Sequence, residues 1–301
     1  MRLRRVSAMV AAAVAMTVTG GGIAQAAPPL LPNVLPRVPG LEALLPPPPV
    51  DLGKSFARLT KDITKAVPGR VGVAITATGS GEPAFFGTVR TARAWSTLKA
   101  PVAVAAERAA VEGLPTMEAK SIRDSDNDAA EAIWAALGDT RQAAEAVGAV
   151  LREGGDHRTQ VSSELNRPAS FPGATRWATT DQSVFAANLP CLPGADRVVA
   201  NMAEVGPNQK WGLAAGKRGV STAVKGGWGP VSDRTGKYVV RQLAVVTAAR
   251  GTVGVSLVAL PASGSLTDGA AMLTRVGDWV QRNLAHLPAG RCAPTLAIPR
   301  I

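Results

Sequence analysis

The sequence predicts an α+β fold, with one five-stranded antiparallel sheet flanked by helices and a separate lobe made only of helices. Two observations predict this fold class. Apolar, strand-like runs occur near both ends of the folded segment, and the residues between them have the apolar spacing of helices. A sheet built from both ends of a chain places the terminal helices against it and leaves the middle helices to form their own lobe.

The first elements are one helix and two strands. Apolar positions recur with helical spacing over 52–66, and Pro68-Gly69 ends this helix. The run 70–81 is strand-like, and its Gly-Ser-Gly turn leads into a second strand over 82–89. These two strands are the N-terminal contribution to the predicted sheet.

The middle of the chain is predicted to be helical. A threonine cap at Thr179 opens one of these helices, and residues 111–124 are expected to be a short connection. The expected helices span 96–112, 126–138, 140–155, 179–188 and 194–205.

After Gly219 the apolar period changes from that of helices to that of strands. Short turns separate three further strands, and an amphipathic helix closes the fold. The strands are expected over 222–229, 237–249 and 251–261, and the helix over 267–284.

Residues 1–26 have the layout of a secretory signal peptide. Arg2, Arg4 and Arg5 precede a short apolar run, and small residues ending at Ala26 form a cleavage site. The apolar run is too short to span a membrane, and no later stretch is long enough. We therefore expect a secreted, extracytoplasmic protein without a membrane span.

Residues 27–50 contain nine prolines and little periodicity, which predicts an extended linker, with a disordered tail as the alternative. Residues 51–301 then form the folded domain. Once three arginines leave with the signal peptide, the net charge falls from +11 to +8. An exported basic protein favours anionic cell-wall polymers as partners. The lack of an arginine-rich run and the single tyrosine argue against nucleic acid.

The two cysteines, Cys191 and Cys292, predict one structural disulfide, because exported proteins meet an oxidising environment. Two free, buried thiols are the alternative. The sequence argues against a zinc site, since the only histidines, His157 and His286, do not have ligand spacing with the cysteines.

Ser96 and Lys99 stand three positions apart in the otherwise apolar helix predicted for 96–112. At that spacing the two side chains share one helix face. A lysine that burial keeps neutral can accept the proton of a serine hydroxyl, which makes the serine a nucleophile. The alternative is a helix N-terminus with a lysine that faces solvent.

Two further motifs follow in order. Ser125-Asp126-Asn127 matches S-D-N, and Lys225-Gly226-Gly227 is similar to K-T-G. The set S-x-x-K, S-D-N and K-T-G on helix, loop and strand is associated with penicillin-recognising serine enzymes. From about 55 to 285, the chain therefore resembles the superfamily of class A β-lactamases and DD-peptidases. Glu164-Leu165-Asn166, in the loop before 179–188, resembles the class A side.

The resemblance implies a role for each motif residue and no cofactor. Ser96 would be the nucleophile, Lys99 its base, and Ser125 the group that passes a proton to the leaving nitrogen. Lys225 would bind a substrate carboxylate. The backbone N–H groups of Ser96 and Trp228 would hold the oxyanion. The remaining substrate-binding positions would be Asn127, Gly226, Gly227, Glu164 and Asn166.

Other mechanisms fit less well. A Ser-His-Asp triad needs a histidine in reach, and His157 and His286 lie in polar or C-terminal segments where we expect them to be exposed. The branch of the superfamily with a tyrosine in place of the middle serine is excluded, because Tyr238 is not followed by the required asparagine.

The resemblance has three departures. Ser162 stands where class A enzymes carry the glutamate that activates the deacylating water. Glu164 corresponds to a structural glutamate of the family, and the alternative is that it substitutes as the base. Gly226 lacks the hydroxyl of K-T-G. Ser96 and Ser125 are only 29 positions apart, which implies a trimmed helical lobe and an open cleft. Slow deacylation is therefore expected.

We accordingly expect an exported serine hydrolase or acyltransferase, in which a β-lactam or a D-alanyl peptide of peptidoglycan acylates Ser96. Two alternatives remain open. One is a binding module that keeps the fold but turns over poorly or not at all, and the other is a basic wall-associated protein spaced by its proline-rich segment.

Overall fold

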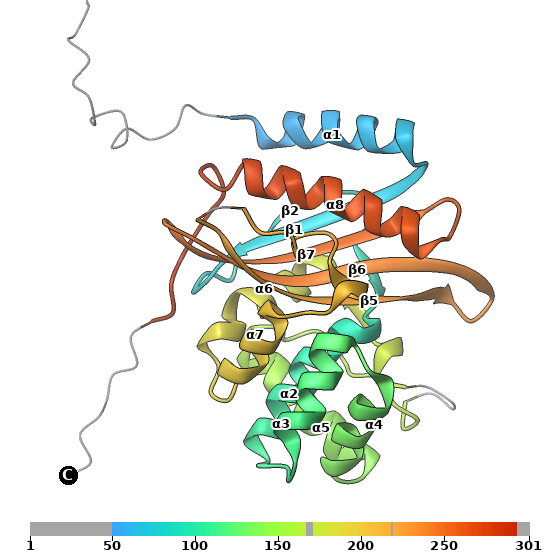
Figure 1. Cartoon of the computed structure of the whole chain (residues 1–301), viewed down its shortest axis with the longest axis vertical. Coiled ribbons are helices and arrows are strands. Elements are labelled where there is room, and N and C mark those ends of the chain that lie inside the picture. Colours follow the sequence, from blue (N-terminus) through green and yellow to red (C-terminus); the bar gives the residue numbers. More distant parts are fainter. Residues whose placement is uncertain (1–49, 167–170, 218, 294–301) are drawn as a thin grey trace, which may run out of the picture. The chain divides into compact units, whose positions relative to one another are not determined.

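The computed structural model describes residues 50–166, 171–217 and 219–293, so the predicted signal peptide and nearly all of the predicted linker lie outside the described residues. The expected five-stranded sheet is confirmed (Figure 1). Its order is β2-β1-β7-β6-β5, and every neighbouring pair is antiparallel. The strands are β1 (Gly69–Ala77), β2 (Ala84–Gly87), β5 (Ser221–Ser232), β6 (Thr235–Ala248) and β7 (Gly251–Pro261).

Two helices from opposite ends of the domain cover one face of the sheet. They are α1 (Leu52–Ala66) and α8 (Leu266–Arg282), and they lie together above the strands in Figure 1. The side chain of Asp51 caps the first turn of α1 by accepting a backbone hydrogen bond. The rings of Phe56 and Trp279 pack edge to face with centroids 5.0 Å apart, and they belong to the apolar core between these helices and the sheet.

The opposite face of the sheet carries α6 (Thr179–Asn188), which lies against β1 and β7. Gly254 permits this close approach, because a Cβ there would stand 2.0 Å from the backbone nitrogen of Ala187. The hydroxyls of Thr76 and Ser183 are hydrogen-bonded at 2.8 Å between strand and helix. The helical lobe is thus joined to the sheet through a buried helix.

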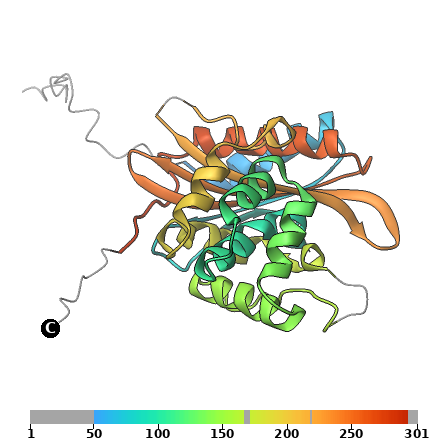
Figure 2. The ribbon, with the colours of Figure 1, turned by 60° about the horizontal axis from the view of Figure 1, so that its bottom comes forward.

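The rest of the lobe consists of short helices below the sheet (Figures 1 and 2). They surround a second apolar core, which is separate from the core beneath α1 and α8. The helices are α2 (Lys99–Arg108), α3 (Leu114–Ala119), α4 (Asn127–Ala136), α5 (Thr140–Glu153) and α7 (Asp196–Ala203).

Three details of the helix predictions were wrong. The stretch 96–112 is a 3₁₀ helix, Trp95–Leu98, followed by the shorter α2. The expected connection 111–124 contains α3, since Leu114 is buried and starts a turn after the left-handed Gly113. Thr179 is not a cap: Ala178 holds that position.

The Thr179 hydroxyl instead donates to the carbonyl of Val89 at 2.9 Å. This bond lies beside a two-stranded sheet that the sequence did not predict, formed by β3 (Thr91–Arg93) and β4 (Arg176–Ala178). The small sheet fixes the chain just before Ser96 against the start of α6.

Cys191 and Cys292 form a disulfide, as predicted. The bond ties the turn after α6 to the segment that follows α8, and it closes a loop of 101 positions. By restricting the unfolded chain, a crosslink of that length stabilises a fold by about 5 kcal/mol in the chain-entropy model. Within the ranges that the structure describes, no helix is both long and apolar enough to cross a bilayer.

A buried carboxyl, that of Glu118 on α3, lies inside the lobe. Its Oε1 accepts a hydrogen bond from Asn201 Nδ2 at 2.6 Å, and Arg197 Nε lies 3.7 Å from its Oε2. Burial, and then a hydrogen bond with the carboxyl of Glu107, raise the pKa of Glu118 to about 8. Between pH 4.5 and pH 8, the Glu118 carboxyl therefore keeps a proton in the folded protein, whereas the same carboxyl has lost it in the unfolded chain, where its pKa is near 4.5.

Replacing Glu118 with glutamine should remove part of the pH dependence of stability. Because the pKa of Glu118 is raised in the folded protein, its contribution to the free energy of unfolding is fully present below the pKa of the unfolded chain. This contribution is lost as pH rises towards 8. Wild type should therefore lose stability through this group as pH rises from 5 to 8, and E118Q should not. The difference in unfolding free energy, E118Q minus wild type, should rise by roughly 1–3 kcal/mol over that range. Urea unfolding at both pH values checks this. The exposed E112Q serves as control, and an equal pH slope in E118Q and wild type would contradict it.

Candidate active site

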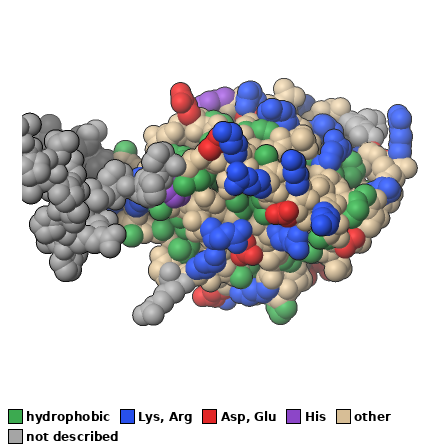
Figure 3. Space-filling view, turned by 90° about the horizontal axis from the view of Figure 1, so that it is seen from above, with side chains coloured by type: hydrophobic (Ala, Val, Ile, Leu, Met, Phe, Trp, Pro, Cys, Tyr) green, Lys and Arg blue, Asp and Glu red, His purple; other side chains and the backbone are tan. Residues whose placement is uncertain are grey.

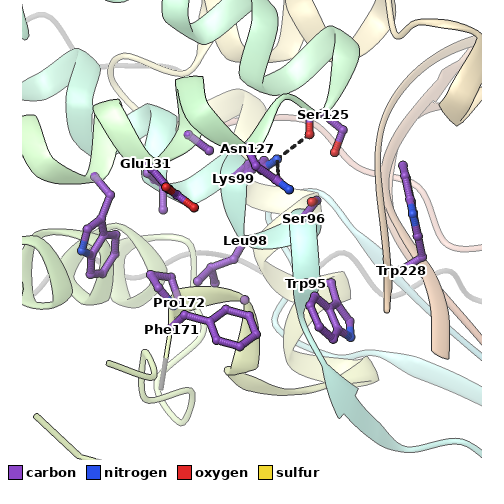
Figure 4. Close-up of a pocket in the computed structure, with 14 residues that line it drawn as sticks. Trp95, Ser96, Leu98, Lys99, Ser125, Asn127, Glu131, Phe171, Pro172 and Trp228 are labelled. Carbon is purple, nitrogen blue, oxygen red and sulfur yellow. Dashed lines mark hydrogen bonds between the residues drawn. The ribbon is translucent and has the colours of Figure 1, made fainter. Parts of the chain in front are cut away.

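A pocket of about 420 Å³ opens where the edge strand β5 meets the helical lobe. Five of the predicted site residues line it: Ser96, Lys99, Ser125, Asn127 and Trp228. Ser96 lies in the turn Trp95–Leu98, Lys99 begins α2, Ser125 lies just before α4, Asn127 begins α4, and Trp228 is on β5. In Figure 4, Ser96, Lys99, Ser125 and Asn127 gather near the centre, and Trp228 stands to their right. Segments that are 132 positions apart at their extremes, from 96 to 228, therefore contribute to one site.

Ser96 lies in the 3₁₀ turn that precedes α2. The backbone N–H of Lys99 donates to the carbonyl of Ser96, so the two side chains project from one turn. Buried Thr97 holds this turn: its hydroxyl donates to the Ala94 carbonyl at 2.6 Å and accepts from Gln182 Nε2 at 2.9 Å. The turn that carries Ser96 is thereby fixed from below.

The ammonium group of Lys99 is enclosed by acceptors from the S-D-N segment. Its Nζ donates to the carbonyl of Ser125 at 2.7 Å, to that of Asp126 at 3.0 Å, and to Asn127 Oδ1 at 2.8 Å. Burial lowers the pKa of Lys99 to about 8, whereas the charges of Asp126 and Glu131 oppose this shift. A sizeable fraction of Lys99 is therefore neutral near pH 8 and able to accept a proton.

Ser125 is held between two lysines. Its carbonyl accepts from Lys99, and its Oγ accepts from Lys225 Nζ at 3.0 Å. Its backbone is left-handed, with φ 59, at the junction where a π-helical turn ends and Asp126 caps α4. Such a conformation in a residue other than glycine is uncommon and clusters at functional sites.

Lys225 is fully buried on β5 and lies outside the pocket lining. Besides Ser125 Oγ, its Nζ donates to Gln209 Oε1 at 2.6 Å and to the Gly226 carbonyl at 2.9 Å. Burial, and then the charge of Lys99, hold the pKa of Lys225 well below its usual value. Lys225 reaches the pocket through Ser125, so its direct contact with a substrate carboxylate stays a prediction.

The glycines that follow Lys225 allow β5 to approach the Ser96 turn. A Cβ at Gly227 would stand 2.8 Å from the Ala94 carbonyl and 3.1 Å from the Ser96 nitrogen. A Cβ at Gly226 would stand 2.8 Å from the ring of Trp211. A side chain at position 226 would therefore require the Trp211 ring to shift.

The sequence did not predict the role of Gln209, which is fully buried between the two halves of the site. Its Oε1 accepts from Lys225 Nζ and from the Gly226 N–H, and its Nε2 donates to the carbonyls of Ile122 and Arg123 at 2.9 and 2.8 Å. A single amide therefore ties β5 to the turn before Ser125.

Removing that amide should destabilise the fold. In Q209L, Lys225 Nζ and the Gly226 N–H each lose an acceptor and the Ile122 carbonyl loses its Gln209 donor, whereas the Arg123 carbonyl keeps the Gly206 N–H at 2.7 Å. Each unsatisfied buried group costs about 1–3 kcal/mol. We expect the free energy of unfolding to fall by about 2–4 kcal/mol. Urea unfolding checks this, with the exposed neighbour N208A as control. A loss as small as that of N208A would show that the network is not structural.

A second network that the sequence did not predict lies beneath the Ser96 turn. Arg241, fully buried on β6 opposite Gly227, donates to Gln182 Oε1 at 2.8 Å and to the Ala92 carbonyl at 3.0 Å. Burial lowers the pKa of Arg241 to about 9. Because Gln182 also donates to Thr97, this network connects the sheet to the turn that carries Ser96.

Glu164 and Asn166 are not brought into the site. Neither lines the pocket, and Glu164 is exposed. The amide of Asn166 is engaged within its own loop, where Oδ1 accepts from the Ser163 N–H at 3.0 Å and Nδ2 donates to the Val161 carbonyl at 3.0 Å. Ser162 also lies outside the pocket lining. We therefore assign these residues no contact with a substrate.

No family model and no curated protein sequence matches the chain, but solved structures do. A class A β-lactamase from Bacteroides cellulosilyticus matches with a TM-score of 0.63 at 12% identity, over 79% of this chain and 100% of its own. A mutant of the class A β-lactamase of the last common ancestor of Gram-negative bacteria matches with a TM-score of 0.60 at 21% identity, over 79% of this chain and 100% of its own.

A class A β-lactamase from Mycobacterium abscessus matches with a TM-score of 0.60 at 19% identity, over 77% of this chain and 99% of its own. Each of these matches extends over nearly the whole solved chain, yet the identities are low enough that the similarity concerns architecture. The protein therefore has the fold of the class A β-lactamases.

Proposed function

We propose that the protein is an exported serine hydrolase or acyltransferase, in which a β-lactam or a D-alanyl peptide-like amide acylates Ser96. The observation that carries this proposal is the convergence of Ser96, Lys99, Ser125 and Asn127 on one pocket, with Lys225 hydrogen-bonded behind them. Burying two lysines so close together costs free energy. A fold without chemistry at this place has no physical reason to keep them.

Acylation would proceed in two steps. Neutral Lys99 takes the proton of Ser96 Oγ as that oxygen attacks the carbonyl carbon, and the backbone N–H groups of Ser96 and Trp228 hold the oxyanion. The bond from carbon to nitrogen then breaks, and Ser125 Oγ gives its proton to the leaving nitrogen while it takes up the proton that Lys99 received, which leaves Lys99 neutral again. Lys225, which donates to Ser125 Oγ, polarises that hydroxyl.

We further propose that the release of the acyl group is slow. Ser162 carries no carboxylate and lies outside the pocket lining, so the loop that holds it offers no base for the deacylating water. The experiment that tests the proposal is the intact mass of the purified protein after mixing with benzylpenicillin. A covalent adduct of one penicillin per chain is the expected result, and its absence with β-lactams and small esters alike would contradict the proposal.

A binding module without turnover is the second candidate, and the hydrogen bonds of Lys99 favour it. All three N–H bonds of the ammonium go to the S-D-N segment, and among the described residues no hydrogen bond joins Lys99 to Ser96. Such acceptors stabilise the charged form, which cannot act as a base. An unreactive Ser96 that still binds a peptide in the pocket would support this candidate.

The partners proposed from composition also have a surface that suits them. Figure 3 shows many Lys and Arg side chains on the face over α1 and α8. On α1, the four basic residues Lys54, Arg58, Lys61 and Lys65 are exposed and repeat at helical spacing. We propose that this face attracts anionic cell-wall polymers, and that attraction would weaken as salt rises.

A further inference from the structure

We propose that Glu131 is the base that activates water for the deacylation of Ser96. This inference rests on the proposed acylation and names the group that performs its second, slow step in place of the missing loop carboxylate. Glu131 is the only acidic residue among the described residues that line the pocket. Its carboxylate points into the pocket on the side of Lys99 in Figure 4.

The position of Glu131 follows from the geometry of α4. Asn127 opens this helix, and Glu131 stands four positions later, so the two side chains project from the same face. Asn127 Oδ1 accepts from Lys99 Nζ at 2.8 Å, which places that face against the turn that carries Ser96. Glu131 is therefore one helical turn further along the pocket wall. The charge of Glu131 also acts on the pKa of Lys99, raising it against the effect of burial.

Other carboxylates near the site are engaged or directed elsewhere. Asp126 accepts the Ala129 N–H at 2.7 Å as the cap of α4, and neither Asp126 nor Glu164 lines the pocket. The segment 167–170, which lies outside the described residues, reads Arg-Pro-Ala-Ser and has no acidic residue. Glu131 itself is exposed to solvent, so water reaches its carboxylate without a barrier.

The step balances as an ester hydrolysis. A Glu131 oxygen takes one proton from water as the water oxygen forms a bond with the acyl carbon. The tetrahedral intermediate then breaks its bond to Ser96 Oγ, and that oxygen takes up the proton that Glu131 received, directly or through Lys99. The products are a carboxylic acid and the free serine, and no further reactant is required.

Two kinetic measurements test this assignment in wild type, E131Q and E131A. Intact mass at short times after mixing with benzylpenicillin gives the acylation rate, and loss of the adduct after removal of free penicillin gives the deacylation rate. We expect acylation to stay within about threefold of wild type and deacylation to fall by about 100-fold or more. E145Q, the same change on an exposed residue of α5 outside the pocket lining, should leave both rates unchanged.

Three results would overturn the assignment. Equal deacylation in wild type and E131Q would mean that another group, such as Lys99, activates the water. Slower acylation with unchanged deacylation would mean that Glu131 contacts the substrate instead. If no adduct and no hydrolysis of a chromogenic cephalosporin are seen in any protein, wild type included, the proposed acylation of Ser96 is itself wrong. Adducts that form in every protein but decay equally contradict only the role of Glu131.

Discussion

Replacing Ser96 with alanine should abolish the covalent adduct with benzylpenicillin, while the protein still folds. The hydroxyl of Ser96 is the nucleophile in the proposed reaction, and alanine has no atom that can form the ester. Ser96 lies half-buried at the pocket wall. Because the turn is held by Thr97 and not by the Ser96 side chain, we expect the free energy of unfolding to change by less than about 1 kcal/mol.

The matched control is S162A, which removes a hydroxyl outside the pocket lining. It should form the adduct as wild type does. Intact mass and peptide mapping of the wild-type adduct provide the measurement, with the added mass on the peptide that contains Ser96. An adduct of equal yield in S96A would mean that another side chain reacts, and the proposed mechanism would then be wrong.

The sheet and the long helices could be predicted from the sequence because their signals are local. The helix expected at 52–66 matches α1, and the run 251–261 matches β7, since each repeats its apolar pattern over many residues. The short elements could not. β3 and β4 have three residues each and pair across at least 83 positions, from 93 to 176, so no periodic pattern marks them. With six residues, α3 is also too short to show a helical period.

The site divides in the same way. Ser96, Lys99, Ser125 and Asn127 belong to short motifs whose spacing carries the chemistry, and the structure places all four in the pocket. Gln209 belongs to no motif, because its partners Lys225 and Ile122 approach it only in the folded chain. The distance in sequence between Gln209 and these partners does not reveal that they touch. Packing between β5 and the lobe creates it.

Glu131 is an intermediate case. It stands four positions after Asn127, so helical spacing alone places the two on one face of α4. That signal was present in the sequence, but the resemblance to class A enzymes directs attention to the loop of Ser162 and Glu164, so no role was predicted for Glu131. In the structure, Ser162 and Glu164 lie outside the pocket lining, whereas Glu131 lies within it.

Lys99→Met should lower the acylation rate by about 10³-fold or more without destabilising the protein. The neutral amine of Lys99 is the proposed proton acceptor, and methionine keeps the length and the apolar stem but has no basic nitrogen. Lys99→Arg should be equally slow, because a guanidinium retains its proton. The exposed K120M is the control and should react as wild type does.

The effect on stability follows from the sign of the pKa shift. Burial depresses the pKa of Lys99 from 10.5, its value in the unfolded chain, to about 8. Charging Lys99 therefore lowers the stability of the folded protein. This cost begins as pH falls below 10.5 and is fully present below about 8. Methionine removes that cost but leaves three acceptors without a donor. The two effects oppose each other, so the Tm of K99M at pH 7 should equal or exceed that of wild type.

The pH dependence of acylation distinguishes a base from a structural cation. If Lys99 must lose its proton before it accepts that of Ser96, the wild-type acylation rate should rise with pH and level off above about 8. The residual rate of K99M should lack this rise. A steep loss of Tm in K99M would instead make Lys99 a structural ammonium bound to the S-D-N segment. Together with an acylation rate that does not respond to pH, that result would favour a pocket that binds its ligand over one that reacts with it.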